Sequence, residues 1–278
     1  ATREVVAYAL EVEAPAELRA LLLEHLDLAR FQHTDESERL SALELDRLAA
    51  TTPAQARALL EPEGFFNAGV SLERPSPDRV IVRVQPGPRS TIKSLDLSFS
   101  GELQADEALQ QGLRRDWALP VGGLFSQSAW SSAKTAALGR ARANGYPLAR
   151  WGHTTAAVNA ETNEAELQLQ LDSGPLFRLG ALQIEGLKYY APSTIERLAG
   201  FAPGEPYSER LLQDFQERLQ KTLLFDSVNV EIQPEAGEYR ATPVLVRVRE
   251  APRQQATTGI GYHANTGPRL TLEHVHRQ

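Results

Sequence analysis

A repeated pattern of a strand followed by a Gly-Pro pair constrains this chain more than any other feature. The segments 80–84 (VIVRV) and 167–171 (LQLQL) lie 87 residues apart, and each leads within a few residues into Gly-Pro. A third copy at 244–248 (VLVRV) leads into Glu250-Ala251-Pro252. Alternation of apolar and polar side chains indicates strands with one buried face. The spacing therefore predicts consecutive domains of similar design.

The residues after each Gly-Pro pair recur as well. Segments 92–97 and 179–184 carry apolar residues at the same three places, which predicts one short strand in each repeat. Two helical stretches follow this strand. In the third repeat we expect the first helix to begin with a capping box at Ser193–Glu196 and the second helix to begin at Ser208.

The second helix of each repeat ends in a turn with a distinctive composition. Gly64-Phe65-Phe66 and Gly145-Tyr146 are typical of a left-handed cap followed by an apolar residue. The third repeat has no glycine there and reads Leu223-Leu224-Phe225. If Leu223 takes the place of Gly145, the second helix of the third repeat is about one turn shorter than that of the second repeat. Because the difference is a whole turn, its apolar side chains stay on the same face of the helix.

Each repeat thus reads strand–helix–helix–strand–strand, which predicts an α+β fold with a helix pair on a three-stranded mixed sheet. We expect three such domains, at 1–90, 91–175 and 176–252, and a tail at 253–278. Because the Gly-Pro junctions are short, neighbouring domains are expected to touch.

The first domain departs from the other two by an insertion. We expect a helix from Ala14-Pro15 through Leu28 and an inserted helical stretch at 36–50. A further short helix is expected to begin with Thr52-Pro53-Ala54-Gln55 and to end before Gly64.

The tail differs from the rest in pattern. Residues 256–262 and 268–276 alternate around a turn-like Asn-Thr-Gly, which predicts a β-hairpin. A lone hairpin is marginally stable in water. We therefore expect it to be the start of a larger sheet, truncated here.

Composition excludes several classes of function. Lys and Arg total 29 and Asp and Glu total 36, a net charge of −7, so nucleic acid is not expected as a partner. Cysteine is absent, which excludes thiolate catalysis, Cys-type zinc sites and disulfides. Methionine is absent too, so we expect the start of the chain to have been processed or cut.

Two motifs that could bind a ligand are better explained as ordinary residues of β-strands. Residues 259–264 match G-x-G-x-x-A, but a strand rather than a helix follows, so no nucleotide site is expected. His274 and His276 share a face and His263 could join them on a metal, yet we favour ordinary strand side chains. We expect no catalytic residue, cofactor or metal. A hydrolase with a carboxylate pair between domains stays open as an alternative.

The Gly-aromatic turns and the repeated element order resemble POTRA domains, the periplasmic modules of the outer-membrane assembly superfamily. Residues 259–270 look like the first barrel hairpin of the TamA family, the outer-membrane subunits of the translocation and assembly module. Three POTRA domains directly before a barrel is the number in that family. BamA-type factors, with five, and two-partner secretion transporters, with two, remain alternatives.

The resemblance implies a non-enzymatic scaffold in the periplasm of a Gram-negative bacterium, attached to an outer-membrane barrel. Its partners would be a TamB-like subunit anchored in the inner membrane and unfolded outer-membrane protein clients such as autotransporters. A stand-alone periplasmic binding module is a further alternative.

The resemblance also indicates where partners would bind. In POTRA domains the strand after the second helix lies at a sheet edge, so a client segment could add a strand there through main-chain bonds. The candidate edges are Val70-Ser71-Leu72, His153 to Val158, and Val228-Asn229-Val230. We expect the first of these to contact the TamB-like partner.

Overall fold

The computed structural model describes residues 6–33, 40–252, 254–263 and 267–276. They form two compact units, and the boundary between the units runs through the middle repeat. The first unit holds residues 1–98, 111–138 and 151–171, and the second holds the remainder. In the part of the chain that is described, no helix is both long and apolar enough to cross a membrane.

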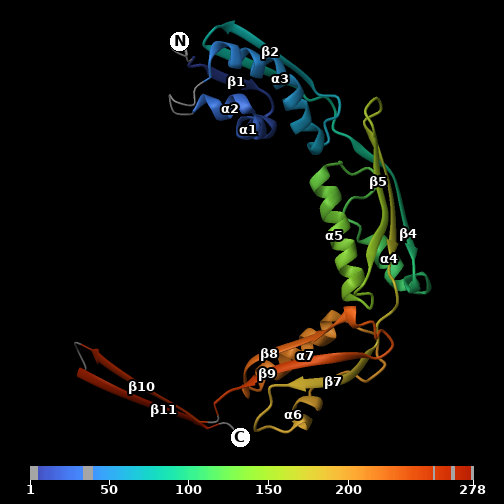
Figure 1. The fold of residues 1–278 in the computed structure, drawn as a ribbon, viewed down its shortest axis with the longest axis vertical. Helices are drawn as coiled ribbons and strands as arrows, with labels where there is room; N and C mark the ends of the chain where they lie inside the picture. Colours follow the sequence, from blue (N-terminus) through green and yellow to red (C-terminus); the bar gives the residue numbers. More distant parts are fainter. Residues whose placement is uncertain (1–5, 34–39, 253, 264–266, 277–278) are drawn as a thin grey trace. The chain divides into compact units, whose positions relative to one another are not determined.

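The first unit begins with the first repeat, drawn in blue to teal in Figure 1. Its three strands pair in the order β1-β3-β2, with β1 parallel and β2 antiparallel to the central strand. The helices contribute buried leucines such as Leu22 and Leu60, which pack with Val82 of the sheet. The elements are β1 (Ala9–Glu13), α1 (Ala16–His25), α2 (Asp27–Gln32), α3 (Ala42–Leu60), the 3-10 turn η2 (Glu61–Glu63), β2 (Gly69–Ser76) and β3 (Arg79–Gln85).

The helices of this repeat differ from the prediction at two places. The predicted helix through Leu28 is wrong, because the fully buried Leu26 is extended (φ −68°, ψ 135°) and separates α1 from α2. The predicted break at Thr52-Pro53 is also wrong, because α3 continues through Pro53. Within the described part of the predicted stretch 36–50, α3 begins at a capping box that Ser41 and Glu44 make.

A continuous buried stripe explains why α3 survives its proline. Leu45, Ala49, Thr52, Ala56 and Leu60 follow one another at helical spacing and are all buried. Proline inside a helix costs roughly 3 kcal/mol. Burial on both sides of Pro53 offsets that cost, so tertiary packing decides the outcome against local propensity.

The second repeat has the same element order. Its sheet pairs in the order β4-β6-β5 and also belongs mainly to the first unit. Trp117 and Trp130 are buried and meet edge to face with ring centroids 6.2 Å apart. The elements are β4 (Thr91–Ser100), η3 (Glu102–Ala105), α4 (Glu107–Arg115), α5 (Gln127–Ala143), β5 (Arg150–Asn159) and β6 (Glu164–Asp172).

The second unit contains the third repeat, drawn in yellow to orange in Figure 1, whose sheet pairs in the order β7-β9-β8. The helix α7 buries Leu212, Phe215 and Leu219 against the sheet. The elements are β7 (Leu179–Glu185), α6 (Pro192–Glu196), α7 (Glu209–Lys221), β8 (Phe225–Ile232), η4 (Pro234–Ala236) and β9 (Thr242–Glu250).

The predicted capping box at Ser193–Glu196 is wrong. The N-cap of α6 is Ala191, and Pro192 occupies the first helical position, where its missing N–H costs nothing. Ser208 is the N-cap of α7 as predicted, but its side chain makes no capping bond.

The tail forms the predicted hairpin, with β10 (Gln254–His263) antiparallel to β11 (Gly267–His276). In this register His263 lies opposite Gly267, whereas His274 lies opposite Ala256. At about 3.4 Å per residue, the two histidines are therefore roughly 20 Å apart along the hairpin. This distance rules out a metal site that joins His263 to His274 and His276. The G-x-G-x-x-A motif falls in β10 as far as His263, and Ala264 lies outside the described residues.

Two leucines of α3 provide a matched test of this core. Leu45 is fully buried, whereas Leu43 is 62% exposed. We predict that Leu45→Ala lowers the free energy of unfolding by about 2–5 kcal/mol, because it removes buried methyl groups and leaves a cavity. Leu43→Ala should change it by less than about 0.5 kcal/mol. Urea titrations of both variants followed by circular dichroism check this, and equal losses would show that α3 packs differently.

Candidate partner-binding site

The three candidate segments each lie in a strand at the edge of a sheet. Val70–Leu72 lies in β2, His153–Val158 in β5 and Val228–Val230 in β8, and each of these strands pairs on one side with the central strand of its sheet. Each edge follows directly after the second long helix of its repeat, so the same local order produces all three. The sequence therefore located these edges correctly, and their use by a partner is a separate question.

Side chains on these edges alternate between the core and solvent. In β2, Val70 and Leu72 pack partly on the core, whereas Ser71 between them is exposed. In β8, Val228 and Val230 are buried and Asn229 is exposed. Because the apolar side chains already face inward, the outer edge offers main-chain groups and small polar side chains. Such an edge can pair with an extended segment of many sequences.

The second edge is more open than the other two. Most residues of β5 are exposed or half-buried, and His153 and Thr155 join across the same face with Nε2 and Oγ1 2.7 Å apart. Gly152 adds no side chain to this stretch, and glycine in a strand often marks a place where another backbone approaches closely. β5 is therefore as accessible to an added strand as β2 and β8.

The exposed face of the first sheet carries a charged bridge across all three strands. Arg83 of the central strand bonds Glu13 of β1 at 2.7 Å and Glu73 of β2 at 2.6 Å. The hydrogen bond that Arg83 donates to Glu13, together with the negative charges of Glu13 and Glu73, raises the pKa of Arg83. In the third repeat Arg247 bridges Glu185 and Glu231 in the same way, at 3.3 and 2.7 Å.

These bridges make the sheet face an unsuitable surface for apolar clients. Exposed ion pairs contribute little to stability, with a typical value below about 1 kcal/mol. They nevertheless place fixed charges over the middle of the sheet, where an apolar ligand would have to desolvate them. The bridges therefore keep the open faces of the first and third sheets hydrophilic.

At the turn after the second helix, the chain connects closely to the next repeat. Ser90 donates its N–H to the carbonyl of Gly64 at 2.8 Å, and its own carbonyl accepts from Phe125 N–H at 2.8 Å. Phe177 makes the same two bonds, to Gly145 O and from Tyr207 N–H, both at 2.8 Å. The predicted left-handed turns are confirmed, with φ 95° at Gly64 and 101° at Gly145.

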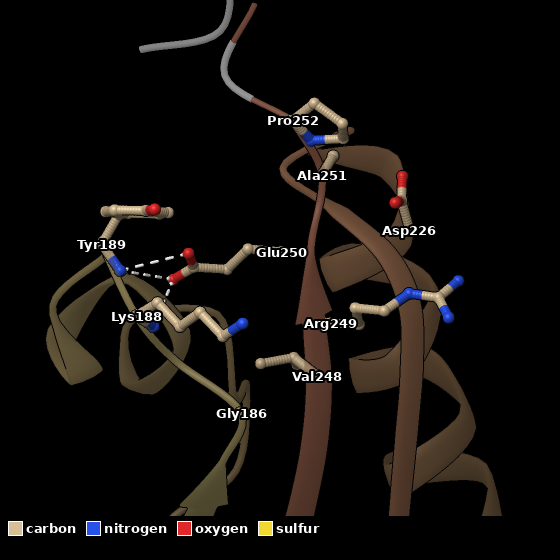
Figure 2. A pocket seen from close by; sticks show the side chains of 9 residues that line it. All are labelled: Gly186, Lys188, Tyr189, Asp226, Val248, Arg249, Glu250, Ala251 and Pro252. Atoms are coloured by element: carbon tan, nitrogen blue, oxygen red, sulfur yellow. Dashed lines mark hydrogen bonds between the residues drawn. The ribbon is translucent and has the colours of Figure 1, made fainter.

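A groove of about 550 Å³ lies at the corresponding end of the third repeat, as Figure 2 shows. One wall is the loop before α6, and the other is the end of β9, where Glu250 stands. The Glu250 carboxylate accepts the backbone N–H groups of Lys188, Tyr189 and Tyr190 at 2.9, 3.0 and 3.0 Å. Burial opposes ionisation of this carboxyl, but the three donors and the Lys188 ammonium outweigh it and hold the pKa of Glu250 below its ordinary value.

The first repeat has a similar groove of about 580 Å³ at the same structural position. Its walls are the start of α1, the turn at Glu63 and Phe65, and the end of β3 with Pro86 and Arg89. In the second repeat, direct bonds join the two walls. Glu102 N–H donates to Gly174 O, and Leu176 N–H donates to the Glu102 carboxylate, both at 3.1 Å.

Sequence reasoning missed the charged bridges. It also missed the three hydrogen bonds by which the Glu250 carboxylate holds the loop at 188–190, which we call the Glu250 clasp. The bridges left a trace, because Arg83 and Arg247 occupy the same place in two copies of the repeated strand and each outer strand carries a glutamate. The clasp left none, because a carboxylate that binds three successive amides depends on a loop conformation that spacing does not reveal.

The family comparison identifies one repeat directly. Residues 177–251 match the model of the POTRA family, described as the surface antigen variable number repeat. This match covers the third repeat alone. The first and second repeats share its sheet order, with the strand after the helices at one edge and the last strand in the centre, although the first repeat has one α-helix more. The chain therefore has the predicted fold of three tandem POTRA-type domains.

Solved structures with a similar arrangement are only distantly related. POTRA domains 3–5 of BamA from Haemophilus influenzae align over 90% of this chain and 99% of their own, with 18% identity and a TM-score of 0.47. POTRA domains 1–3 of Omp85 from Anabaena align over 89% and 96%, with 17% identity and a TM-score of 0.34. CdiB from Acinetobacter baumannii aligns over 62% and 32%, with 11% identity and a TM-score of 0.33. No curated protein matches the sequence.

The clasp at Glu250 predicts a pH-dependent loop. A carboxyl whose pKa is depressed in the folded state stabilises that state above its unfolded pKa, and the contribution is lost as pH falls through the folded pKa. We predict that hydrogen-exchange protection of the 188–190 amides falls as the solution is acidified through that range. Glu250→Gln should show low protection at neutral pH already.

A second glutamate provides the control. Glu235 lies in η4 of the same repeat, away from the 186–190 loop in sequence, and Glu235→Gln should leave the protection of these amides unchanged. If Glu250→Gln protects them as well as the native chain does at neutral pH, the clasp does not hold the loop.

Proposed function

We propose that this chain is the periplasmic scaffold of an outer-membrane protein assembly or translocation factor. It binds partner and client polypeptides as added strands on the edges of its POTRA domains. The observation that carries the proposal is the repeated free edge, with apolar side chains turned inward and main-chain groups turned outward, in β2, β5 and β8. Main-chain pairing tolerates many client sequences, which suits a factor with many substrates.

The lining of the grooves also fits a binding role. The two grooves at the repeat ends are lined by proline, aromatic and aliphatic residues with scattered charges, rather than by a converging acid–base pair.

We further propose that the factor is TamA-like, with an outer-membrane barrel that continues from the β10–β11 hairpin. Its partners would then be a TamB-like inner-membrane-anchored subunit and unfolded outer-membrane proteins such as autotransporters. The resemblance of residues 259–270 to the first barrel hairpin of that family supports this branch. A BamA-type factor or a two-partner secretion transporter is the alternative, and the full gene distinguishes them by its number of POTRA domains.

Within this proposal, β2 is the contact for the TamB-like subunit. The first domain is the most acidic part of the chain and lies farthest in sequence from the hairpin. A stand-alone periplasmic binding module would use the same edges for soluble clients, but it would need no inner-membrane partner.

Proline substitutions at β2 test strand addition. Neighbouring residues of a strand direct their N–H groups to opposite sides, so one of Val70→Pro and Ser71→Pro removes an outward donor and the other removes a donor to β3. We predict that the variant with the lost outward donor stays folded and binds the C-terminal region of a TamB-like subunit at least tenfold more weakly. Binding to the immobilised chain, with circular dichroism as the check of folding, measures this.

Ser71→Ala is the matched control, because it keeps the main chain and removes only the exposed hydroxyl. It should bind like the native chain. A folded proline variant with native affinity would overturn strand addition at β2, and the same variants tested with an unfolded porin separate client binding from partner binding.

A further inference from the structure

Residue 223 departs from its counterparts at the end of the second helix. Leu223 has a left-handed backbone, with φ 57°, like Gly64 and Gly145 in the other repeats. Leucine pays about 1–2 kcal/mol to adopt this conformation, whereas glycine does not. The side chain of Leu223 is 68% exposed, so little packing inside the third repeat offsets that cost.

In the first two repeats, the segment that follows fills the space where a side chain would stand. A Cβ atom on Gly64 would lie 2.2 Å from the carbonyl oxygen of Phe125, and one on Gly145 would lie 2.5 Å from Cδ1 of Leu176. Carbon and oxygen atoms do not approach this closely. Glycine is therefore required twice over at Gly64, for its backbone angle and because the obstructing atom belongs to the backbone. At Gly145 the obstructing atom is the end of the flexible Leu176 side chain, so there the backbone angle is the main requirement.

The side chain of Leu223 is incompatible with such a junction. We propose that Leu223 ends the series of closely joined repeats and, together with Tyr189, forms a docking surface for a different neighbour, the β10–β11 hairpin of this chain. The inference concerns the order of the modules and holds whichever client the edges bind.

The hairpin is the occupant that the local chain path supports. At both earlier junctions the segment that follows the central strand covers the turn. After β9, Ala251 donates its N–H to Leu224 O at 2.8 Å, which holds the chain beside the turn before it continues through Pro252 into β10. The hairpin is thus the next segment to meet this surface.

The surface itself suits an apolar partner. Tyr189 is 69% exposed and stands at the rim of the groove, near the end where Pro252 leaves the repeat (Figure 2). Glu250 fixes the loop that carries Tyr189 through its bond to that residue's amide. Leu223 precedes the residue that binds Ala251, and Tyr189 lines the groove that includes Ala251, so each places a large exposed side chain near the point where the chain leaves the repeat. Such side chains suit contact with an alternating strand better than a backbone junction.

The first test separates steric exclusion from backbone strain. We predict that Gly64→Leu lowers the hydrogen-exchange protection of the Ser90 amide at least tenfold, because the new side chain cannot fit beside the Phe125 carbonyl and breaks the bond from Ser90 to residue 64. Gly204→Leu is the control, since Gly204 also has positive φ (89°) but a Cβ there would meet nothing within 4 Å. It should leave the Ser90 amide as protected as in the native chain.

Leu223→Gly completes this comparison. Glycine removes the strain at position 223 and an exposed side chain, so the midpoint of thermal unfolding should not fall. Native protection of Ser90 in Gly64→Leu, or a clear loss of stability in Leu223→Gly, would overturn the role assigned to Leu223.

The second test identifies the occupant and uses the absence of cysteine from the chain. Leu223→Cys is combined in the intact chain with one cysteine at Gln255, Ala256, Thr257 or Thr258, and the pairs are oxidised. Successive residues of β10 face opposite sides, so we predict efficient disulfide formation with alternate positions only.

Leu43→Cys, a similarly exposed leucine of the first repeat, is the control and should form little disulfide with any of the four positions. Yields without alternation, or equal to those of the Leu43→Cys pairs, would show that the hairpin does not dock at Leu223.

Discussion

The left-handed turn after the second helix is the constraint on which each repeat depends. At this point the chain leaves the helix layer, reverses and enters the edge strand, so one backbone conformation sets both the register of the edge and the connection to the next module. Glycine meets this demand at positions 64 and 145 without strain. The carbonyl of the same glycine accepts a hydrogen bond from the backbone N–H of Ser90 in the first repeat or of Phe177 in the second. Folding of a repeat and joining of repeats are therefore linked through one residue.

The design explains why the edges are free. Each helix pair covers one face of its sheet and each central strand is the last of its repeat, so the strand after the turn is left with a single partner. Its apolar side chains are needed by the core, and the charged bridges at Arg83 and Arg247 keep the open face of the first and third sheets hydrophilic. What stays available is a row of main-chain groups, which is the kind of surface that binds by shape and hydrogen bonding more than by side-chain identity.

Much of this could be read from the sequence, for reasons that particular residues make clear. Period-two alternation at 80–84, 167–171 and 244–248 fixed the central strands, because a strand buried on one face has no other pattern. The turns at Gly64 and Gly145 were predictable, since few residues tolerate positive φ. The continuity of α3 through Pro53 was not, because it depends on burial of Leu45 and Leu60 against elements distant in sequence. The capping of α6 by Ala191 depended on the preference of proline for the first helical position, which competed with Ser193.

The candidate binding residues also fall into two groups, those that the sequence predicts and those that only the folded structure shows. The edges followed from the repeat, whereas the Glu250 clasp and the close approach at Gly64 are properties of folded geometry and leave little trace in spacing. The central claim is that polypeptides bind by adding a strand to these edges. Amide exchange of the ¹⁵N-labelled chain, measured with and without an unfolded outer-membrane porin, tests it most directly. The account predicts new protection at alternate residues of β2, β5 or β8, where the outward N–H groups lie. Protection confined to the sheet faces or the end grooves, with the edges unchanged, would contradict it.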